Sequence, residues 1–217
     1  MADIFREVDE ELSRDRAMAA WRKHGKYVIV FAVVLVLAVA GFSGWQDYRE
    51  RQRQAEGRSY VQAIDLVMRD DTKSATAAMT QIAAEGGGYS LLAQLEEASL
   101  KIRAGDKAGA IKIYDDMAAN GDVSRPFRDL ATILSVMTSL DKGDPAALKK
   151  RLEPLAAPDQ PFHPSAIELE GLLALRQGDF KAAKQSFRSL SDDAAAPTGM
   201  RQRATQILAW IGERGGA

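Results

Sequence analysis

The chain has 217 residues, and its 29 Lys and Arg side chains are nearly balanced by 30 Asp and Glu, for a formal net charge of -1. This balance argues against a nucleic-acid-binding protein, which needs a basic face or stripe. The absence of cysteine excludes a disulfide framework, a thiol nucleophile and an acylated cysteine anchor.

The first predicted element is a helix over residues 27–45, a stretch without any formally charged side chain. At about 1.5 Å per residue this helix would be about 28 Å long, close to the hydrocarbon thickness of a bilayer. Lys23 and Lys26 precede the stretch, Arg49 follows it, and Tyr27 and Trp45 stand at its ends. Cations and aromatic rings in these places are typical of membrane interfaces. The sequence therefore predicts one uncleaved transmembrane helix.

Two other interpretations of this stretch fit less well. Ala38-Val39-Ala40 has the small-x-small form of a signal-peptidase site, but the preceding 26 residues are too long and too acidic for an export leader. A buried helix would carry polar residues on its outer face, and none occurs before Ser43. Six Lys and Arg side chains precede the stretch, and four lie in the first fifteen residues after it. This excess on the amino-terminal side favours a cytoplasmic amino terminus. We therefore expect a cytoplasmic tail over 1–26, a transmembrane helix over 27–45 and an exported domain over 46–217.

The exported domain is predicted to be entirely helical. All seven prolines lie late in the chain, at 126, 145, 154, 158, 161, 164 and 197, where they can begin or end helices. Alternating runs of strand type are missing. The breaks between the apolar runs leave helices of about 11 to 17 residues, the ordinary length for packed hairpins.

These helices are predicted to form about four repeated hairpins. Gly-Asp pairs at 105–106, 143–144 and 178–179, with Asp-Asp at 70–71, mark turns separated by 35, 38 and 35 residues. Five residues after each turn stand Ala75, Ala110, Leu148 and Ala183, and nine residues after it stand Met79, Tyr114, Leu152 and Phe187. Small residues allow paired helices to approach, and large ones fill the space between hairpins. Residues 197–214 are expected to form a closing helix that covers the last hairpin.

The pattern resembles the tetratricopeptide repeat, whose consensus has a small residue, a turn glycine, an alanine and an aromatic residue at these offsets. Gly171, Gly178, Ala183 and Phe187 match it best. The tryptophan and tyrosine of the consensus first helix are missing, and Leu148 replaces the alanine in the third copy. The resemblance implies an α-solenoid of degenerate repeats.

The order of segments along the chain is similar to one family, the YfgM-like ancillary subunit of the bacterial Sec translocon. The features that carry this resemblance are DIFREVDEEL at Asp3–Leu12, typical of alphaproteobacterial members, the apolar stretch ending in Gly44-Trp45, a charged connector and the repeats. The resemblance implies a single-pass inner-membrane protein with a periplasmic repeat domain. It also implies three partners: the Sec channel, a membrane-anchored periplasmic chaperone and unfolded secretory proteins.

The first helix of each hairpin is expected to line a concave surface that binds a peptide or a segment of a partner. A second interpretation is that Leu95, Met137 and Leu172 are only core between repeats. The predicted partner-binding residues are Ile64, Leu95, Ser99, Arg103, Met137, Leu172 and Arg176.

No pattern in the sequence favours catalysis, a cofactor or a metal. The histidines, His24 and His163, form no pair with ligand spacing, and no glycine-rich phosphate loop or nucleophile elbow occurs. Gly86-Gly87-Gly88 follows a predicted helix, which favours a hinge or cap. We therefore predict a binding module without chemistry of its own; the alternative function is a scaffold for envelope assembly or cell division.

Overall fold

The computed structural model describes the backbone of residues 2–214. Side chains are described from residue 34 to residue 213, and before residue 34 only at Met18, Trp21, Arg22, Lys26 and Phe31. Within this part of the chain all regular structure is helical, so the all-helical prediction is confirmed. The chain divides into two compact units, the first ending at Gly57 and the second beginning at Arg58.

The first unit consists of the greater part of one continuous helix, α1 (Ala2–Met68). The prediction that residues 27–45 form a transmembrane helix is wrong: no helix in the described part of the chain is both long enough and apolar enough to cross a membrane.

Part of the predicted span and the motif at Asp3–Leu12 lie outside the described side chains. The residues of the span concerned are 27–30, 32 and 33.

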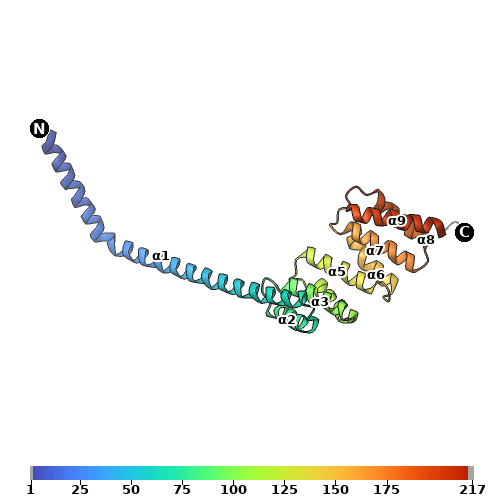
Figure 1. Cartoon of the computed structure of the whole chain (residues 1–217). Helices are drawn as coiled ribbons and strands as arrows, with labels where there is room; N and C mark the ends of the chain where they lie inside the picture. Colours follow the sequence, from blue (N-terminus) through green and yellow to red (C-terminus); the bar gives the residue numbers. More distant parts are fainter. Residues whose placement is uncertain (1, 215–217) are drawn as a thin grey trace. The chain divides into compact units, whose positions relative to one another are not determined.

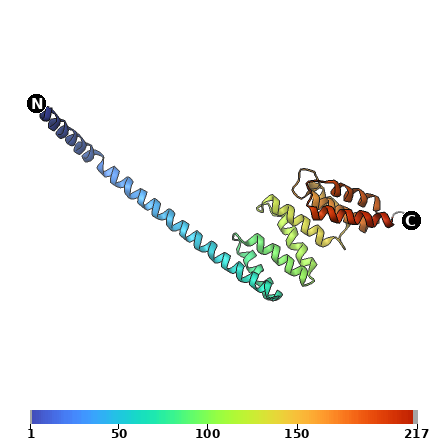
Figure 2. The same ribbon diagram turned by 45° about the horizontal axis from the view of Figure 1, so that its top comes forward.

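The second unit contains four helical hairpins and a closing helix, as the repeat pattern predicts (Figures 1 and 2). The first hairpin pairs the last turns of α1 with α2 (Thr72–Glu85), and the second pairs α3 (Ser90–Arg103) with α4 (Lys107–Ala119). The third pairs α5 (Arg125–Ser139) with α6 (Pro145–Leu152), which a short 3₁₀ turn, η1 (Glu153–Leu155), extends. The fourth pairs α7 (His163–Arg176) with α8 (Phe180–Asp192), and α9 (Thr198–Arg214) follows.

The turns within the hairpins share one local structure. The aspartates at 71, 106, 144 and 179 are N-caps, and each carboxylate accepts a hydrogen bond from the backbone N–H three residues later, at 2.8–3.1 Å. Just before the cap, Asp70, Gly105 and Gly178 adopt the left-handed conformation, with φ of 60°, 85° and 76°. The preceding helix therefore ends and the next begins within three residues.

The third turn differs from the others because it is longer. Five residues, 140–144, separate α5 from α6, and Gly143 is not among the described glycines with positive φ. Arg176 from the next hairpin donates hydrogen bonds to the carbonyls of Leu140 and Gly143 in this turn, the latter at 2.5 Å. A long-range side chain therefore satisfies the carbonyl groups that a left-handed cap satisfies elsewhere.

The core follows the predicted alternation of small and large residues. Ala75, Ala110 and Ala183 are fully buried, as are the large residues Met79 and Phe187. In the fourth hairpin Gly171 on α7 faces Phe187 on α8, and a Cβ built on Gly171 would lie 2.8 Å from Phe187 Cζ. The ring fills the space that the missing side chain leaves, so the two helices cross closely.

Candidate protein-binding surface

Four of the predicted partner-binding residues occupy equivalent positions on the first helices of the hairpins. Each first helix has a small or buried residue at 63, 98, 136 or 171, and the next residue belongs to the predicted set: Ile64, Ser99, Met137 and Leu172. Equivalent positions of a solenoid lie on the same face. Leu95 lies one turn before Ser99 on α3 and joins this face.

Three of these residues are half-buried between hairpins. Ile64 packs against the cluster that contains Met79, and Leu95 packs against the cluster that contains Tyr114. Leu172 contacts the clusters on both sides of α7. Their side chains therefore present only a partial apolar surface to solvent.

Met137 is the most exposed of the predicted positions that are apolar, with 51% of its surface accessible. Leu92 on α3, which the sequence reasoning missed, is 41% exposed and lies three residues before Leu95. This helical spacing to Leu95 was the signal that could have identified Leu92. We refer to Leu92, Leu95, Ser99, Met137 and Leu172 as the first-helix face.

The two predicted cations, Arg103 and Arg176, are held by the protein itself. Arg103 Nη2 donates to Asp70 Oδ1 at 2.8 Å, in the turn of the preceding hairpin. Arg176 donates to the carbonyls of the third turn, described above. The donor groups of these two arginines are therefore engaged within the protein.

Polar contacts of this kind recur at the spacing of the repeats. In the described part of the chain five side-chain pairs join residues 33 to 36 positions apart: Arg103–Asp70, Lys107–Asp141, Arg125–Gln160, Arg151–Asp115 and Arg203–Glu168. Each links one hairpin to a neighbouring hairpin or to α9. We refer to these contacts as inter-repeat ties.

The tie at Asp115 also involves a fully buried residue, Ser135. Asp115 Oδ1 accepts a hydrogen bond from Ser135 Oγ at 2.6 Å and another from Arg151 Nη2 at 2.5 Å. Ser135 is fully buried, so this carboxylate satisfies a hydroxyl that has no access to water. The contact joins α4, α5 and α6.

The closing helix α9 is fixed at the side of α7. Arg203 donates two hydrogen bonds to Glu168, at 2.9 and 3.1 Å, and these bonds raise the pKa of Arg203. The rings of Trp210 on α9 and Phe180 at the start of α8 are 6.4 Å apart. Ala204 and Ile211 are buried against the last hairpin, as expected for a closing helix.

Two grooves lie away from the first-helix face. One, of about 480 Å³, is bounded by Pro158, His163 and the end of α8. The other, of about 550 Å³, is bounded by the start of α2 and the end of α3. His163 contacts the Ala156 carbonyl at 2.8 Å through Nδ1, and the described residues contain no group of three or more side chains that could hold a metal ion.

Comparison with known proteins agrees with this architecture. The model of the tetratricopeptide repeat-like domain family matches residues 19–208. A relative from Aggregatibacter actinomycetemcomitans, described as an ancillary SecYEG translocon subunit, is 26% identical over 204 residues, which cover 92% of this chain and 96% of the relative. The predicted resemblance to ancillary translocon subunits has this support, whereas the alphaproteobacterial type stays a prediction. Because the family match extends over most of the chain and the hairpins have the expected structure, the chain belongs to the tetratricopeptide repeat-like domain family.

Proposed function

We propose that the chain is an ancillary, non-catalytic subunit of the Sec translocon that binds other proteins through the first-helix face. The observation that carries the proposal is the exposed apolar surface around Met137 and Leu92 on helices of a tetratricopeptide repeat-like array. Repeats of this kind use such surfaces to hold extended or helical segments. The name of the relative supports the choice of the translocon as partner.

The first-helix face suits segments that are apolar and carry little charge. Three of the charged groups beside it, Arg103, Arg176 and Glu168, are engaged in contacts within the protein. Met137 is unbranched and flexible, so its thioether adapts to different partner side chains. This chemistry suits unfolded secretory proteins, which expose apolar segments before they fold. A membrane-anchored periplasmic chaperone is the second proposed partner.

The first test is purification of the full chain together with the translocon. We expect the Sec channel to copurify with the chain. A photoreactive residue in place of Met137 should crosslink to secretory proteins during export, whereas the same residue in place of exposed Ala77, on the second helix of the first hairpin, should not. Reproducible absence of the channel, or equal crosslinking from both positions, would contradict the proposal.

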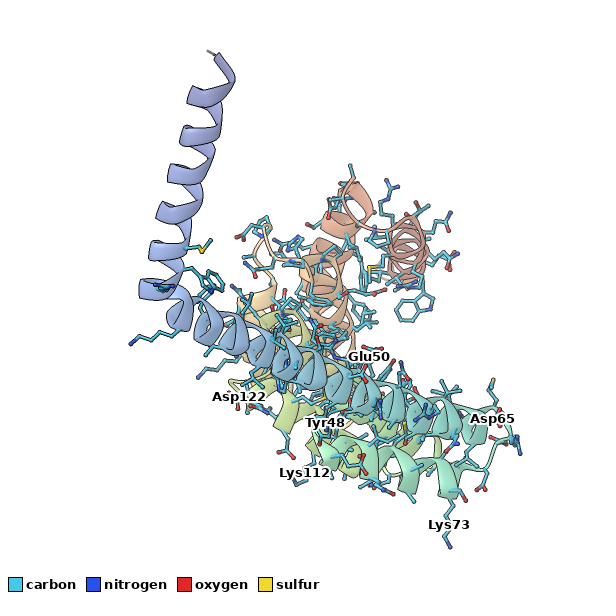
Figure 3. All side chains as sticks on the ribbon, turned by 90° about the vertical axis from the view of Figure 1, so that its left-hand side faces the viewer. Tyr48, Glu50, Asp65, Lys73, Lys112 and Asp122 are labelled. Atoms are coloured by element: carbon cyan, nitrogen blue, oxygen red, sulfur yellow. The ribbon has the colours of Figure 1, made fainter. Side chains whose placement is uncertain are left out.

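We further propose that the repeats act on the periplasmic side of the inner membrane. Since the natural chain has no cysteine, one introduced cysteine gives an unambiguous label. With cysteine in place of exposed Lys73, whose side chain points away from α2 in Figure 3, a membrane-impermeant maleimide should label intact spheroplasts. Labelling only after the spheroplasts are lysed would place the repeats in the cytoplasm instead.

A further inference from the structure

The outer surface of α8 carries a row of three exposed cations, Lys181, Lys184 and Arg188. Their spacing of three and four residues puts them on one side of the helix, opposite the buried Ala183 and Phe187. The row is about 10 Å long, since an α-helix rises about 1.5 Å per residue. Within the described part of the chain, none of the three side chains takes part in an ion pair or a hydrogen bond.

Several cations on other helices, unlike these three, have partners within the protein. Lys107 and Arg151 are used in inter-repeat ties, and Lys112 pairs with Asp116 at 2.6 Å on its own helix. Arg203 is held by Glu168. The charges of α8 are therefore not needed for the fold.

The preceding hairpin has two more exposed cations on its second helix. Lys149 and Lys150 on α6 are exposed and lie 35 positions before Lys184 and Gln185, at equivalent places in the repeat. The acidic groups beside these cations are Asp179, Asp192, Glu153 and Glu170. Asp179 is occupied as the N-cap of α8, and Asp192 accepts a hydrogen bond from Ser191 at 3.2 Å. Glu153 takes the place equivalent to Arg188, and Glu170 lies beside Lys149. We refer to the five cations as the cationic face: Lys149, Lys150, Lys181, Lys184 and Arg188.

We infer that the cationic face is a second docking surface, separate from the first-helix face, and that it binds an acidic helix of a partner protein. Carboxylates spaced three and four residues apart on a partner helix would match the row on α8. An anionic bilayer fits less well for two reasons. The large apolar side chains exposed near the cations, Phe180 and Trp210, lie against each other with their rings 6.4 Å apart, and the apolar face of α8 is already buried in the core. Binding at the cationic face would not require the translocon or the first-helix face.

The experiment measures binding of a labelled helical peptide to the full chain. The probe carries Glu at three positions spaced three and four residues apart, and a peptide with Gln at those positions is its reference. Lys181→Glu, Lys184→Glu and Arg188→Glu together should weaken binding of the Glu peptide about tenfold or more at low ionic strength. The matched control reverses three exposed cations elsewhere, Arg58, Lys73 and Lys142, and should change the affinity less than about threefold.

A second peptide, of opposite charge, distinguishes a folded surface with reversed charge from a variant that has lost its fold. A peptide with Lys in place of Glu should bind the triple α8 variant more tightly than it binds the natural chain, which requires a folded surface with reversed charge. Equal losses in the two triple variants would mean that only net charge matters, and would overturn the inference. Preferential binding to vesicles with 30% anionic lipid, lost in the α8 variant, would overturn it in favour of a lipid surface.

Discussion

Replacement of Gly171 by alanine should destabilise the fourth hairpin, although alanine is the better helix former. The new methyl group would lie 2.8 and 2.9 Å from two carbon atoms of the Phe187 ring. That ring is fully buried, so it has no free space into which it could move. Overpacking of this kind costs about 1–3 kcal/mol, whereas replacing glycine by alanine in a helix contributes about 0.5–1 kcal/mol. The net loss in the free energy of unfolding should be about 1 kcal/mol, within a range of about 0 to 2.5 kcal/mol.

The same replacement should become stabilising once the ring is shortened. In a Phe187→Leu background the atoms that collide with the methyl group are gone, so only the helix preference of alanine and the filling of the cavity remain. Gly212→Ala on α9 is the matched control, because nothing lies within 4 Å of its new Cβ, and it should stabilise by about 0.5–1 kcal/mol.

The assay is urea unfolding of the full chain followed by far-ultraviolet circular dichroism, with four proteins in a double-mutant cycle. The decisive quantity is the sign of the Gly171→Ala effect in the two backgrounds. If alanine stabilised both the natural chain and the Phe187→Leu variant, the close crossing of α7 and α8 would relax without cost. The reasoning from the Gly171–Phe187 contact would then be wrong.

Three further predictions concern the binding face, the inter-repeat ties and the effect of pH. Met137→Glu should abolish crosslinking of secretory proteins to a photoreactive residue at Leu92, while unfolding changes by less than about 0.5 kcal/mol because Met137 is exposed. Arg151→Met should cost about 1 kcal/mol or less in urea unfolding, since Asp115 keeps its bond to Ser135 and is partly solvated. Burial raises the pKa of Glu170, opposed by Lys149 and reinforced by Glu153. The folded state thus favours the protonated form, so Glu170 should destabilise above its raised pKa and cease to do so as the pH falls toward 4.5. Glu170→Gln should therefore raise the urea midpoint at pH 7 more than at pH 4.5.

The hairpins could be predicted from the sequence because their turns are determined locally. An aspartate N-cap and a left-handed residue before it need only three adjacent residues, and both are visible as Gly-Asp pairs. Gly143-Asp144 looks the same in the sequence, but its turn is longer and depends on Arg176, 33 residues away. Local chemistry could not indicate that contact.

The binding surface was harder to predict because the sequence does not show which side chains are already engaged. Arg103 and Arg176 occupy positions that a peptide ligand could reach, yet both are bound to turns of the preceding hairpin. The separation of 33 to 36 residues between partners is a signal that periodicity alone could have provided. The span at 27–45 was predicted from composition, and no helix in the described part of the chain is long enough and apolar enough to cross a membrane.

The inter-repeat ties also explain why the two proposed docking surfaces differ in character. Ties near the first helices pair Arg103 and Glu168 with opposite charges, and Arg176 donates to backbone carbonyls of the third turn. The first-helix face therefore presents mainly apolar groups. Among the described residues no tie reaches Lys181 or Lys184, and both side chains are exposed. Binding at the first surface should therefore persist in high salt, whereas binding at the second should weaken steeply. A single partner that lost both contacts equally as salt rises would show that the division is wrong.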